Sequence, residues 1–223
     1  ILAHEMLNSF TPVSSLASTI KTLTENEKGE ALSLDQLEAE DISDINVAAA
    51  TIKKRSDGLL VFVKDYRTIS NVPVPQLSTI NVKQFLTGIK TLMSPVTDEA
   101  QVDLKLLPIP PNSNINADSK LIEQVLINLI NNSIHALKGR KNPTIKLSCI
   151  VESDKTIILV NDNGFGIEEK IMNQIFIPFY TTKKNGSGIG LSLSKNIMKK
   201  HDGNLLVSSE VGIYTTFSLI FKN

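Results

Sequence analysis

The period of the hydrophobic pattern changes once along the chain, at a segment that contains two prolines. Before it, apolar residues recur three and four positions apart, which is the spacing of one helix face. After it, short apolar runs typical of strands alternate with helical patterns. Pro73 and Pro75 cannot continue a helix and favour extended backbone before them. We therefore predict two domains, residues 1–70 and 77–223, joined by a linker at 71–76.

The first domain is predicted to be a helical hairpin. A polar break at residues 25–30 separates a first helix, which Pro12 should kink, from a second helix that runs from about Leu34 to Ile69. The apolar stripes are too narrow to form a core by themselves. A second copy of the hairpin would complete a four-helix bundle, so we expect a homodimer. The alternative, in which the hairpin packs on the rest of its own chain, would leave much of it overhanging a compact domain.

The second domain is predicted to be an α/β sandwich, because strands and helices alternate on what reads as one sheet. Asp118 is placed to cap the helix that follows it. Strands are expected at 77–82, 102–107, 113–118, 144–153, 155–162, 204–209 and 214–221, and helices at 82–93, 119–137 and 190–201.

Composition narrows the class of partner. Lys+Arg and Asp+Glu both total 23, and this zero net charge argues against a nucleic-acid partner, because such domains usually carry a basic excess. No apolar stretch approaches the ~20 residues that span a bilayer, so no membrane contact is expected. The lone Cys149 cannot form an internal disulfide, which favours a reducing, intracellular setting. Because the chain begins without Met or a signal-peptide pattern, we expect a piece of a longer protein.

Two glycine-rich segments are candidate ligand loops. Residues 162–167 (D-N-G-F-G-I) follow an apolar strand, so the Asp162 carboxylate can point into a cleft that backbone lines closely; alone, the segment also fits a tight turn. Residues 186–191 (G-S-G-I-G-L) open a helix, whose free N–H groups and dipole suit phosphate; alone, they also fit a flexible loop. The second segment lacks the Gly-Lys-Ser/Thr ending of a Walker-type loop.

Two further groups of polar residues are candidates for chemistry. Asn128 and Asn132 lie four apart in an apolar helix and share a face. Such amides need polar partners, either a Mg²⁺ ion with its waters or hydrogen bonds within the core. His4 and Glu5 place an imidazole beside a carboxylate, which suits a nucleophile and a base but also fits an ordinary helix surface.

Taken in order, these segments resemble the two-component sensor histidine kinases. In that family, a dimerisation and phosphotransfer hairpin precedes an ATP-binding domain of the Bergerat type, which DNA gyrase and the Hsp90 chaperones share. The resemblance covers nearly the whole chain, although Tyr214 stands where the family usually has glycine. The matching segments are His4–Glu5 for the H-box in its nitrogen-regulation form, Asn128 and Asn132 for the N-box, 162–166 for the G1-box, 176–183 for the F-box and lid, and 186–191 for the G2-box.

The resemblance implies ATP and Mg²⁺ as cofactors. Asp162 would accept a hydrogen bond from the adenine amino group, with Thr215 supporting that contact through water, and Asn132 would bind the metal. Lys183 would either reach the γ-phosphate or remain a solvated lid residue. The full set of implied cofactor-binding residues is Asn128, Asn132, Asp162, Gly164, Gly166, Ile167, Phe179, Thr182, Lys183, Gly186, Ser187, Gly188, Ile189, Gly190, Leu191 and Thr215.

The implied activity is autophosphorylation of His4, followed by transfer to an aspartate of a response-regulator receiver domain. Glu5 would orient the imidazole or take its second proton, and Asn8 would support dephosphorylation of the regulator. The chain would be the cytoplasmic part of a larger sensor. A nucleotide-binding dimeric scaffold without kinase activity is the alternative, whereas the hairpin with His4 argues against a chaperone or repair ATPase. His135 and His201 are interpreted as structural or surface residues.

Overall fold

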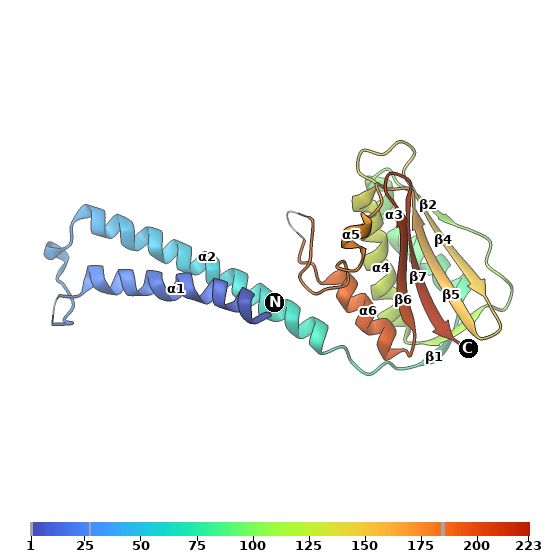
Figure 1. Ribbon diagram of the computed structural model, residues 1–223, viewed down its shortest axis with the longest axis horizontal. Helices are drawn as coiled ribbons and strands as arrows, with labels where there is room; N and C mark the ends of the chain where they lie inside the picture. Colours follow the sequence, from blue (N-terminus) through green and yellow to red (C-terminus); the bar gives the residue numbers. More distant parts are fainter. Residues whose placement is uncertain (1, 27, 184–185) are drawn as a thin grey trace. The chain divides into compact units, whose positions relative to one another are not determined.

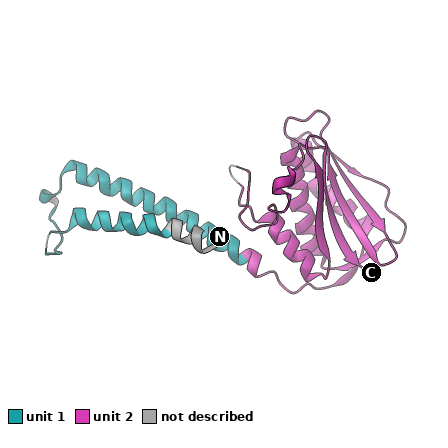
Figure 2. Cartoon of the chain, viewed as in Figure 1, with its two compact units in different colours: residues 1–67 teal, residues 68–223 magenta. Residues whose placement is uncertain are grey.

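The computed structural model describes residues 2–26, 28–183 and 186–223, without the side chains of residues 2–9 and 34. The chain divides into two compact units, Ile1–Arg67 and Thr68–Asn223 (Figure 2). None of the helices in the described residues is both long and apolar enough to cross a membrane.

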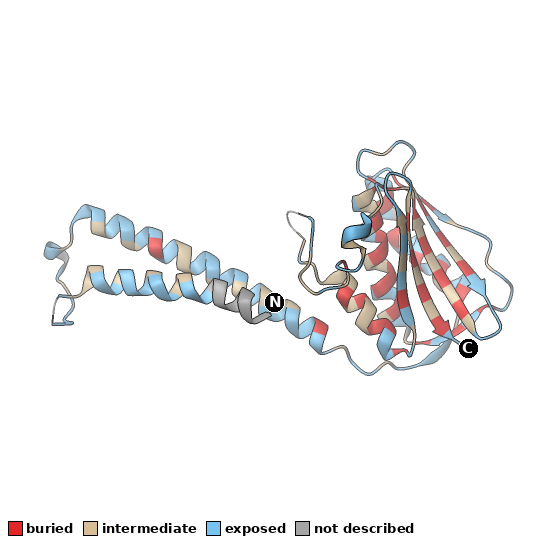
Figure 3. Cartoon of the chain, viewed as in Figure 1, coloured by how far each residue is buried: buried red, intermediate tan, exposed pale blue. Residues whose placement is uncertain are grey.

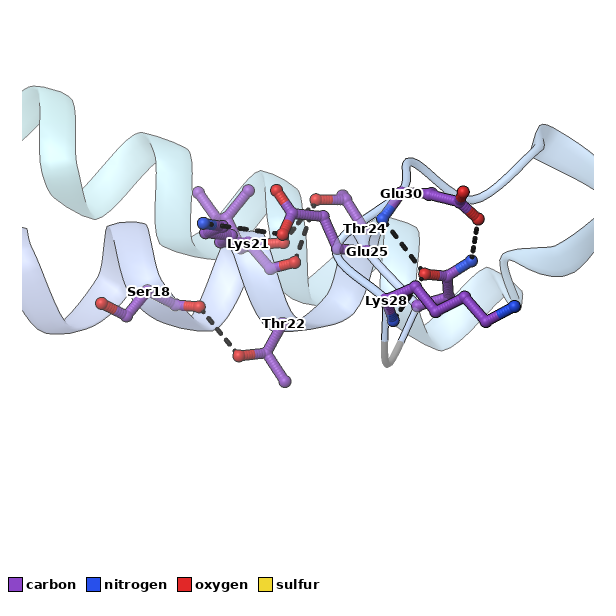
Figure 4. Close-up of polar contacts among 9 residues, drawn as sticks. Ser18, Lys21, Thr22, Thr24, Glu25, Lys28 and Glu30 are labelled. Atoms are coloured by element: carbon purple, nitrogen blue, oxygen red, sulfur yellow. Dashed lines mark hydrogen bonds and ion pairs between the residues drawn. The ribbon is translucent and has the colours of Figure 1, made fainter.

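The first unit consists mainly of α1 (Leu2–Thr24) and of α2 (Ala39–Ser70), which continues into the second unit; the two helices run antiparallel (Figure 1). The structure confirms the predicted hairpin, and α1 is helical on both sides of Pro12. Beyond α1, the side-chain oxygen of Asn26 accepts hydrogen bonds from the backbone of Lys28 at 2.9 Å and Glu30 at 3.1 Å. Figure 4 shows these loop contacts together with the ion pair that joins Lys21 to Glu25.

The second helix begins at Ala39 rather than near Leu34, so that predicted boundary was wrong. Residues Leu34–Gln36 form a separate 3-10 turn, in which the Gln36 side chain accepts the backbone N–H of Ser33 at 2.9 Å. The Asp41 carboxylate then accepts the N–H of Glu38 at 2.9 Å. Side chains that capture backbone donors in this way offer the chain a local alternative to helix, which separates the turn from α2.

Apolar residues remain exposed along the hairpin (Figure 3). Val47, Leu60 and Val61 are 63%, 68% and 59% exposed, respectively. Burying such side chains gains roughly 25 cal/mol per Å² of apolar surface. Covering these side chains with another apolar surface would therefore be favourable, and the homodimer remains a prediction.

The second unit is built on a five-stranded sheet with the strand order β2-β4-β5-β7-β6. β2 runs parallel to β4, and the other neighbours are antiparallel. A small antiparallel pair, β1-β3, lies apart from it. The strand bounds are β1 (Ser78–Asn81), β2 (Asp103–Leu106), β3 (Asn114–Ala117), β4 (Thr144–Val151), β5 (Lys155–Asp162), β6 (Asn204–Glu210) and β7 (Tyr214–Lys222).

Three helices, α3 (Val82–Glu99), α4 (Ser119–Ala136) and α6 (Gly190–Lys200), cover one face of the sheet, and the short α5 (Glu169–Met172) precedes the lid segment (Figure 1). This arrangement confirms the predicted α/β sandwich. In β5 and β7, fully buried residues alternate with partly exposed ones, as expected for strands with one covered face.

α3 is longer than predicted, since it passes Pro95 and ends at Glu99. A proline inside a helix leaves the carbonyl four residues earlier without its N–H partner. Here that carbonyl belongs to Thr91, and the hydroxyl of Ser94 donates to it at 2.9 Å. The side chain replaces the missing backbone bond, and the helix continues.

α4 begins where the sequence predicts, because Asp118 caps it. The carboxylate accepts the backbone N–H groups of Lys120 at 3.0 Å and Leu121 at 3.2 Å. Its other oxygen accepts the N–H of Gln76 at 2.9 Å, which ties the preceding segment to this helix end. These bonds, led by the one from Gln76, hold the pKa of Asp118 below its usual value. α4 is thereby held across the sheet, with one face in the core.

Candidate functional site

A cavity of about 670 Å³ opens in the second unit. Its wall is made by α4, the end of β5 and the loop after it, residues 180–183 and 186–191, and β7. This volume lies within the ~300–1,000 Å³ usual for small-molecule sites. The wall contains every implied cofactor-binding residue except Gly164 and Phe179.

Asp162 ends β5 and is 1% exposed, yet it lines the cavity. Its Oδ2 accepts the hydroxyl of Ser133 at 2.7 Å, and its Oδ1 accepts the backbone N–H of Gly164 at 2.9 Å. Gly164 therefore does not line the cavity, but its backbone N–H holds the Asp162 carboxylate in place. Burial raises the pKa of Asp162, while the two hydrogen bonds act in the opposite direction. The carboxylate is thus a held acceptor in a poorly solvated place.

Ser133 was missed in the sequence, although a signal exists for it. It is 1% exposed and falls on the buried stripe of α4 together with Ile122, Leu126 and Ile130. A polar residue at such a position needs a buried partner. Asp162 is that partner.

The two asparagines of α4 are bound to protein groups in this structure. The amide nitrogen of Asn128 donates to the hydroxyl of Ser194 on α6 at 2.9 Å. The ammonium of Lys183 donates to Oδ1 of Asn132 at 2.6 Å. Burial first, and Lys138 second, lower the pKa of Lys183. Oδ1 of Asn132 therefore already binds one positively charged group. An amide oxygen is also the kind of ligand that Mg²⁺ prefers.

The residues with described side chains contain no group of three or more His, Cys, Asp or Glu that could hold a metal ion. Mg²⁺ is usually bound through one or two protein oxygens together with phosphates of the substrate. The donor set around Asn132 fits that mode rather than an all-protein cage.

Close packing explains two of the glycines. A Cβ at Gly190 would overlap the side-chain amide of Asn128, so a larger residue there would have to displace that amide from its contact with Ser194. Gly188 has φ +69°, and a Cβ on it would lie 2.5 Å from the carbonyl carbon of Phe179. The backbone N–H of Phe179 donates to Gly188 at 3.0 Å. Phe179 thus supports the glycine segment by its backbone and does not line the cavity.

The first turn of α6 faces the cavity through Gly190 and Leu191. Among the described residues, no side-chain hydrogen bond caps this helix at Ile189. The first N–H groups of a helix need partners outside it, and the helix dipole favours a negative one. This end of α6 is therefore suited to an anion.

The loop after β5 also contacts the turn between β6 and β7. Gly212 has φ +79°, its N–H donates to the carbonyl of Phe165 at 2.8 Å, and its carbonyl accepts from Arg140 at 2.9 Å. The turn forms with Tyr214 as the first residue of β7, so glycine is not needed at that position.

Two histidines differ from each other in their placement. His135 is an exposed residue overall, but it lies on the cavity wall, where it was not expected. Its pKa is lowered, first by the partial desolvation of its ring and then by the charges of Lys183 and Lys138. His201 is buried, with Nδ1 2.8 Å from the carbonyl of Ile197 and Nε2 accepting the N–H of Asp118 at 3.0 Å. These contacts confirm the structural interpretation of His201.

The predicted site residues of the hairpin belong to the first unit, whereas the cavity belongs to the second. His4, Glu5 and Asn8 fall within α1, but their side chains lie outside the described residues. Their roles therefore stay predictions.

Comparison with known proteins agrees with this geometry. Residues 117–223 match the family model described as histidine kinase-, DNA gyrase B-, and HSP90-like ATPase. The signal transduction histidine-protein kinase AtoS of Escherichia coli (strain K12) is 29% identical over 219 residues, which are 98% of this chain and 33% of AtoS. The sensor histidine kinase ZraS of Salmonella typhimurium (strain LT2) is 30% identical over 220 residues, which are 98% of this chain and 43% of ZraS. The chain thus spans less than half the length of these curated relatives.

Solved structures give the same result. The catalytic domain of histidine kinase ThkA superposes with a TM-score of 0.58 at 27% identity, covering 66% of this chain and 95% of that domain. ThkA in complex with response regulator protein TrrA has a TM-score of 0.61 at 22% identity, covering 99% of this chain and 59% of that one. Residues 117–223 therefore match the histidine kinase-, DNA gyrase B- and HSP90-like ATPase family, and the chain as a whole is similar to sensor histidine kinases.

Proposed function

We propose that this chain is the phosphotransfer and ATP-binding part of a protein-histidine kinase, which phosphorylates His4 and passes the phosphoryl group to an aspartate of a response regulator. The observation that carries the proposal is the cavity that brings together Asp162, Asn132 and the start of α6. A nucleoside triphosphate with its metal requires three features: a buried hydrogen-bond acceptor, an oxygen ligand for a cation and an anion-binding helix end.

Each feature has a proposed role. Asp162 accepts the adenine amino group, and Gly166 and Ile167 bring backbone close to the base. Gly186, Ser187, Gly188, Ile189, Gly190 and Leu191 surround the phosphates, with Thr182 and Lys183 at the edge and Asn128 holding the start of α6 through Ser194. A Mg²⁺ ion bound with the nucleotide would supply positive charge that neutralises the phosphates, with Asn132 as its protein ligand.

The phosphoryl transfer itself needs few groups beyond a correctly placed nucleophile, since positioning and charge neutralisation dominate such reactions. A neutral imidazole nitrogen of His4 forms the bond to the γ-phosphorus, and the bond from that phosphorus to the β,γ-bridging oxygen breaks, releasing ADP. Glu5 takes the proton from the other ring nitrogen or orients the ring. A carboxylate oxygen of the regulator then attacks the same phosphorus, the phosphorus–nitrogen bond breaks, and His4 takes back a proton to become a neutral imidazole again.

The proposed domains follow from these roles. Residues 1–70 form the dimerisation and phosphotransfer hairpin, which packs its exposed apolar side chains against a second copy in a four-helix bundle. Residues 71–76 are the linker, and 77–223 are the ATP-binding domain. A receiver domain is the proposed partner, by analogy with the solved complex of ThkA and response regulator protein TrrA. Asn8, one helical turn from His4, supports dephosphorylation of the regulator, and the setting is cytoplasmic.

The test is incorporation of label from γ-labelled ATP. The native chain should acquire an acid-labile phosphoryl group, and His4→Gln should bind nucleotide with unchanged affinity while acquiring none. Acid-labile label in His4→Gln would disprove the assignment of the acceptor. Nucleotide binding without any label in the native chain would instead favour the scaffold alternative.

A further inference from the structure

Three neighbouring strands carry a row of polar residues at the inner end of the cavity. In the sheet register Asp162 of β5 lies opposite Thr215 of β7, and Thr215 lies opposite Ser209 of β6. Residues directly opposite in antiparallel pairs project from the same face of a sheet. Asp162 and Thr215 line the cavity and are buried, whereas Ser209 is half-buried and lies outside the wall.

The hydrogen bonds of Ser209 determine which way the Thr215 hydroxyl points. The Ser209 hydroxyl donates to the carbonyl of Tyr214 at 2.7 Å and accepts the backbone N–H of Ile167 at 2.9 Å. A hydroxyl has one proton and two lone pairs. A carbonyl can only accept, so the proton of Ser209 belongs to Tyr214. The 2.9 Å contact between Ser209 Oγ and Thr215 Oγ1 is then donated by Thr215.

As a result, the two cavity residues of this row, Asp162 and Thr215, present only hydrogen-bond acceptors to a ligand. Thr215 has its proton directed at Ser209, which leaves lone pairs of Oγ1 for the cavity. Both oxygens of the Asp162 carboxylate also serve as acceptors, for Ser133 and Gly164. A ligand edge that faces this row must therefore present a donor, because opposed acceptors leave buried groups unpaired.

We propose that Ser209 is a positioning residue that sets the nucleotide specificity of the site, by holding the Thr215 hydroxyl as an acceptor so that an amino-bearing base is selected over a carbonyl-bearing one. Adenine carries an amino group where guanine carries a carbonyl oxygen. The inference rests on the proposed nucleotide site and adds a residue, outside the wall, that determines its selectivity.

The experiment compares the affinities of the 223-residue chain for ADP and GDP, with Mg²⁺ present, by calorimetry. Ser209→Ala removes the acceptor and frees the Thr215 hydroxyl to rotate and donate. The preference for ADP over GDP should fall about tenfold, which corresponds to ~1.4 kcal/mol and to the net worth of one hydrogen bond. Ser209→Thr keeps a hydroxyl at the position and should restore most of the preference.

Controls separate this role from a purely structural one. Ser208→Ala removes the neighbouring hydroxyl, which contacts Tyr214 Oη at 3.2 Å and faces the other side of the strand; the preference should stay as in the native chain. In a Thr215→Val background, Ser209→Ala should have no further effect on the preference, since the group it orients is gone. A structural role would weaken ADP and GDP binding in the same proportion.

The outcomes are distinct. Absence of ADP binding by the native chain would reject the proposed nucleotide site itself. Normal ADP binding without preference over GDP, or a preference that Ser209→Ala leaves within twofold of the native value, would overturn the role of Ser209 alone. Should Ser209→Ala fail to fold, Ser209→Cys preserves the size of the side chain with a weaker acceptor and provides the same comparison.

Discussion

The ammonium of Lys183 donates to Oδ1 of Asn132 across 2.6 Å, joining the lid segment to α4 at the oxygen proposed for the metal. A lysine ammonium and a divalent cation are both attracted to this amide oxygen, but their charges repel each other at such short range. Lys183 is therefore expected to compete with Mg²⁺ for Asn132 until the nucleotide phosphates give the ammonium another partner.

Replacing Lys183 by methionine removes the charge and keeps most of the length of the side chain. The Mg²⁺ concentration that half-saturates ADP binding should fall by roughly threefold to tenfold, equivalent to ~0.6–1.4 kcal/mol. ADP is chosen because it lacks the γ-phosphate, which Lys183 would reach in one of the two interpretations of its role. A titration with Mg²⁺ at fixed ADP measures the midpoint. As a control, Lys138→Met removes a nearby charge but no hydrogen bond to Asn132, so it should change the midpoint less. An unaltered midpoint in Lys183→Met would refute the competition.

Asp162→Asn should weaken ATP binding by roughly 10- to 100-fold, the effect of a lost charge-assisted hydrogen bond of about 1.5–3 kcal/mol. Because burial raises the pKa of Asp162, its ionised form costs folding stability at neutral pH. The variant should therefore melt no earlier than the native chain, which separates lost binding from lost folding. Asp154→Asn makes the same change in the exposed turn between β4 and β5 and should leave affinity intact. Native affinity in Asp162→Asn would remove this carboxylate from the site.

The raised pKa of Asp162 also predicts a pH dependence with opposite signs for stability and binding. A carboxyl whose native pKa exceeds its unfolded value contributes stability at low pH, and this contribution is lost as pH rises through the native pKa. Nucleotide binding needs the ionised acceptor, so affinity should fall as pH drops through that same raised pKa. Calorimetry with ADP from acidic to neutral pH measures the midpoint of this fall.

Ser133→Ala should move that midpoint to higher pH, because the Ser133 hydrogen bond lowers the pKa of Asp162. His135 and Lys183, whose pKa values are also shifted on the cavity wall, are unchanged between the two proteins, so the difference between their profiles reports on Asp162. An identical acid limb in both proteins would mean that Asp162 does not control it.

Two glycine-to-alanine changes should act in opposite directions. Gly88→Ala, in α3 with no atom within 4 Å of the added Cβ, should stabilise the protein by about 0.5–1 kcal/mol through higher helix propensity. Gly190→Ala forces a Cβ onto the Asn128 amide and should destabilise it by about 1–3 kcal/mol, as overpacking does. Denaturant midpoints measure both effects. Equal stability of the two variants would contradict the close contact between α4 and α6.

Much of the fold could be predicted because it depends on local patterns. The change of hydrophobic period near Pro73 separated the helical part from the mixed part, and alternation placed the strands of the sheet close to their observed bounds. The errors occurred where side chains replaced backbone partners: Gln36 and Asp41 delayed the start of α2, and Ser94 allowed α3 to pass Pro95. Such side-chain hydrogen bonds depend on side-chain rotamers, and the spacing of apolar residues in the sequence carries no information about rotamers.

By itself, the sequence determined the fold class, the likeness to sensor histidine kinases and the segments that contribute to the cavity, because each follows from residue types at short spacing. The tertiary structure alone decided the partners of those segments. It brought Ser133 to Asp162, Lys183 to Asn132, and Ser209 to Thr215, pairs separated by 29, 51 and 6 residues. Sheet register and helix packing create these contacts, and hydrogen-bond direction, which defines what a site can recognise, exists only after donor and acceptor have met.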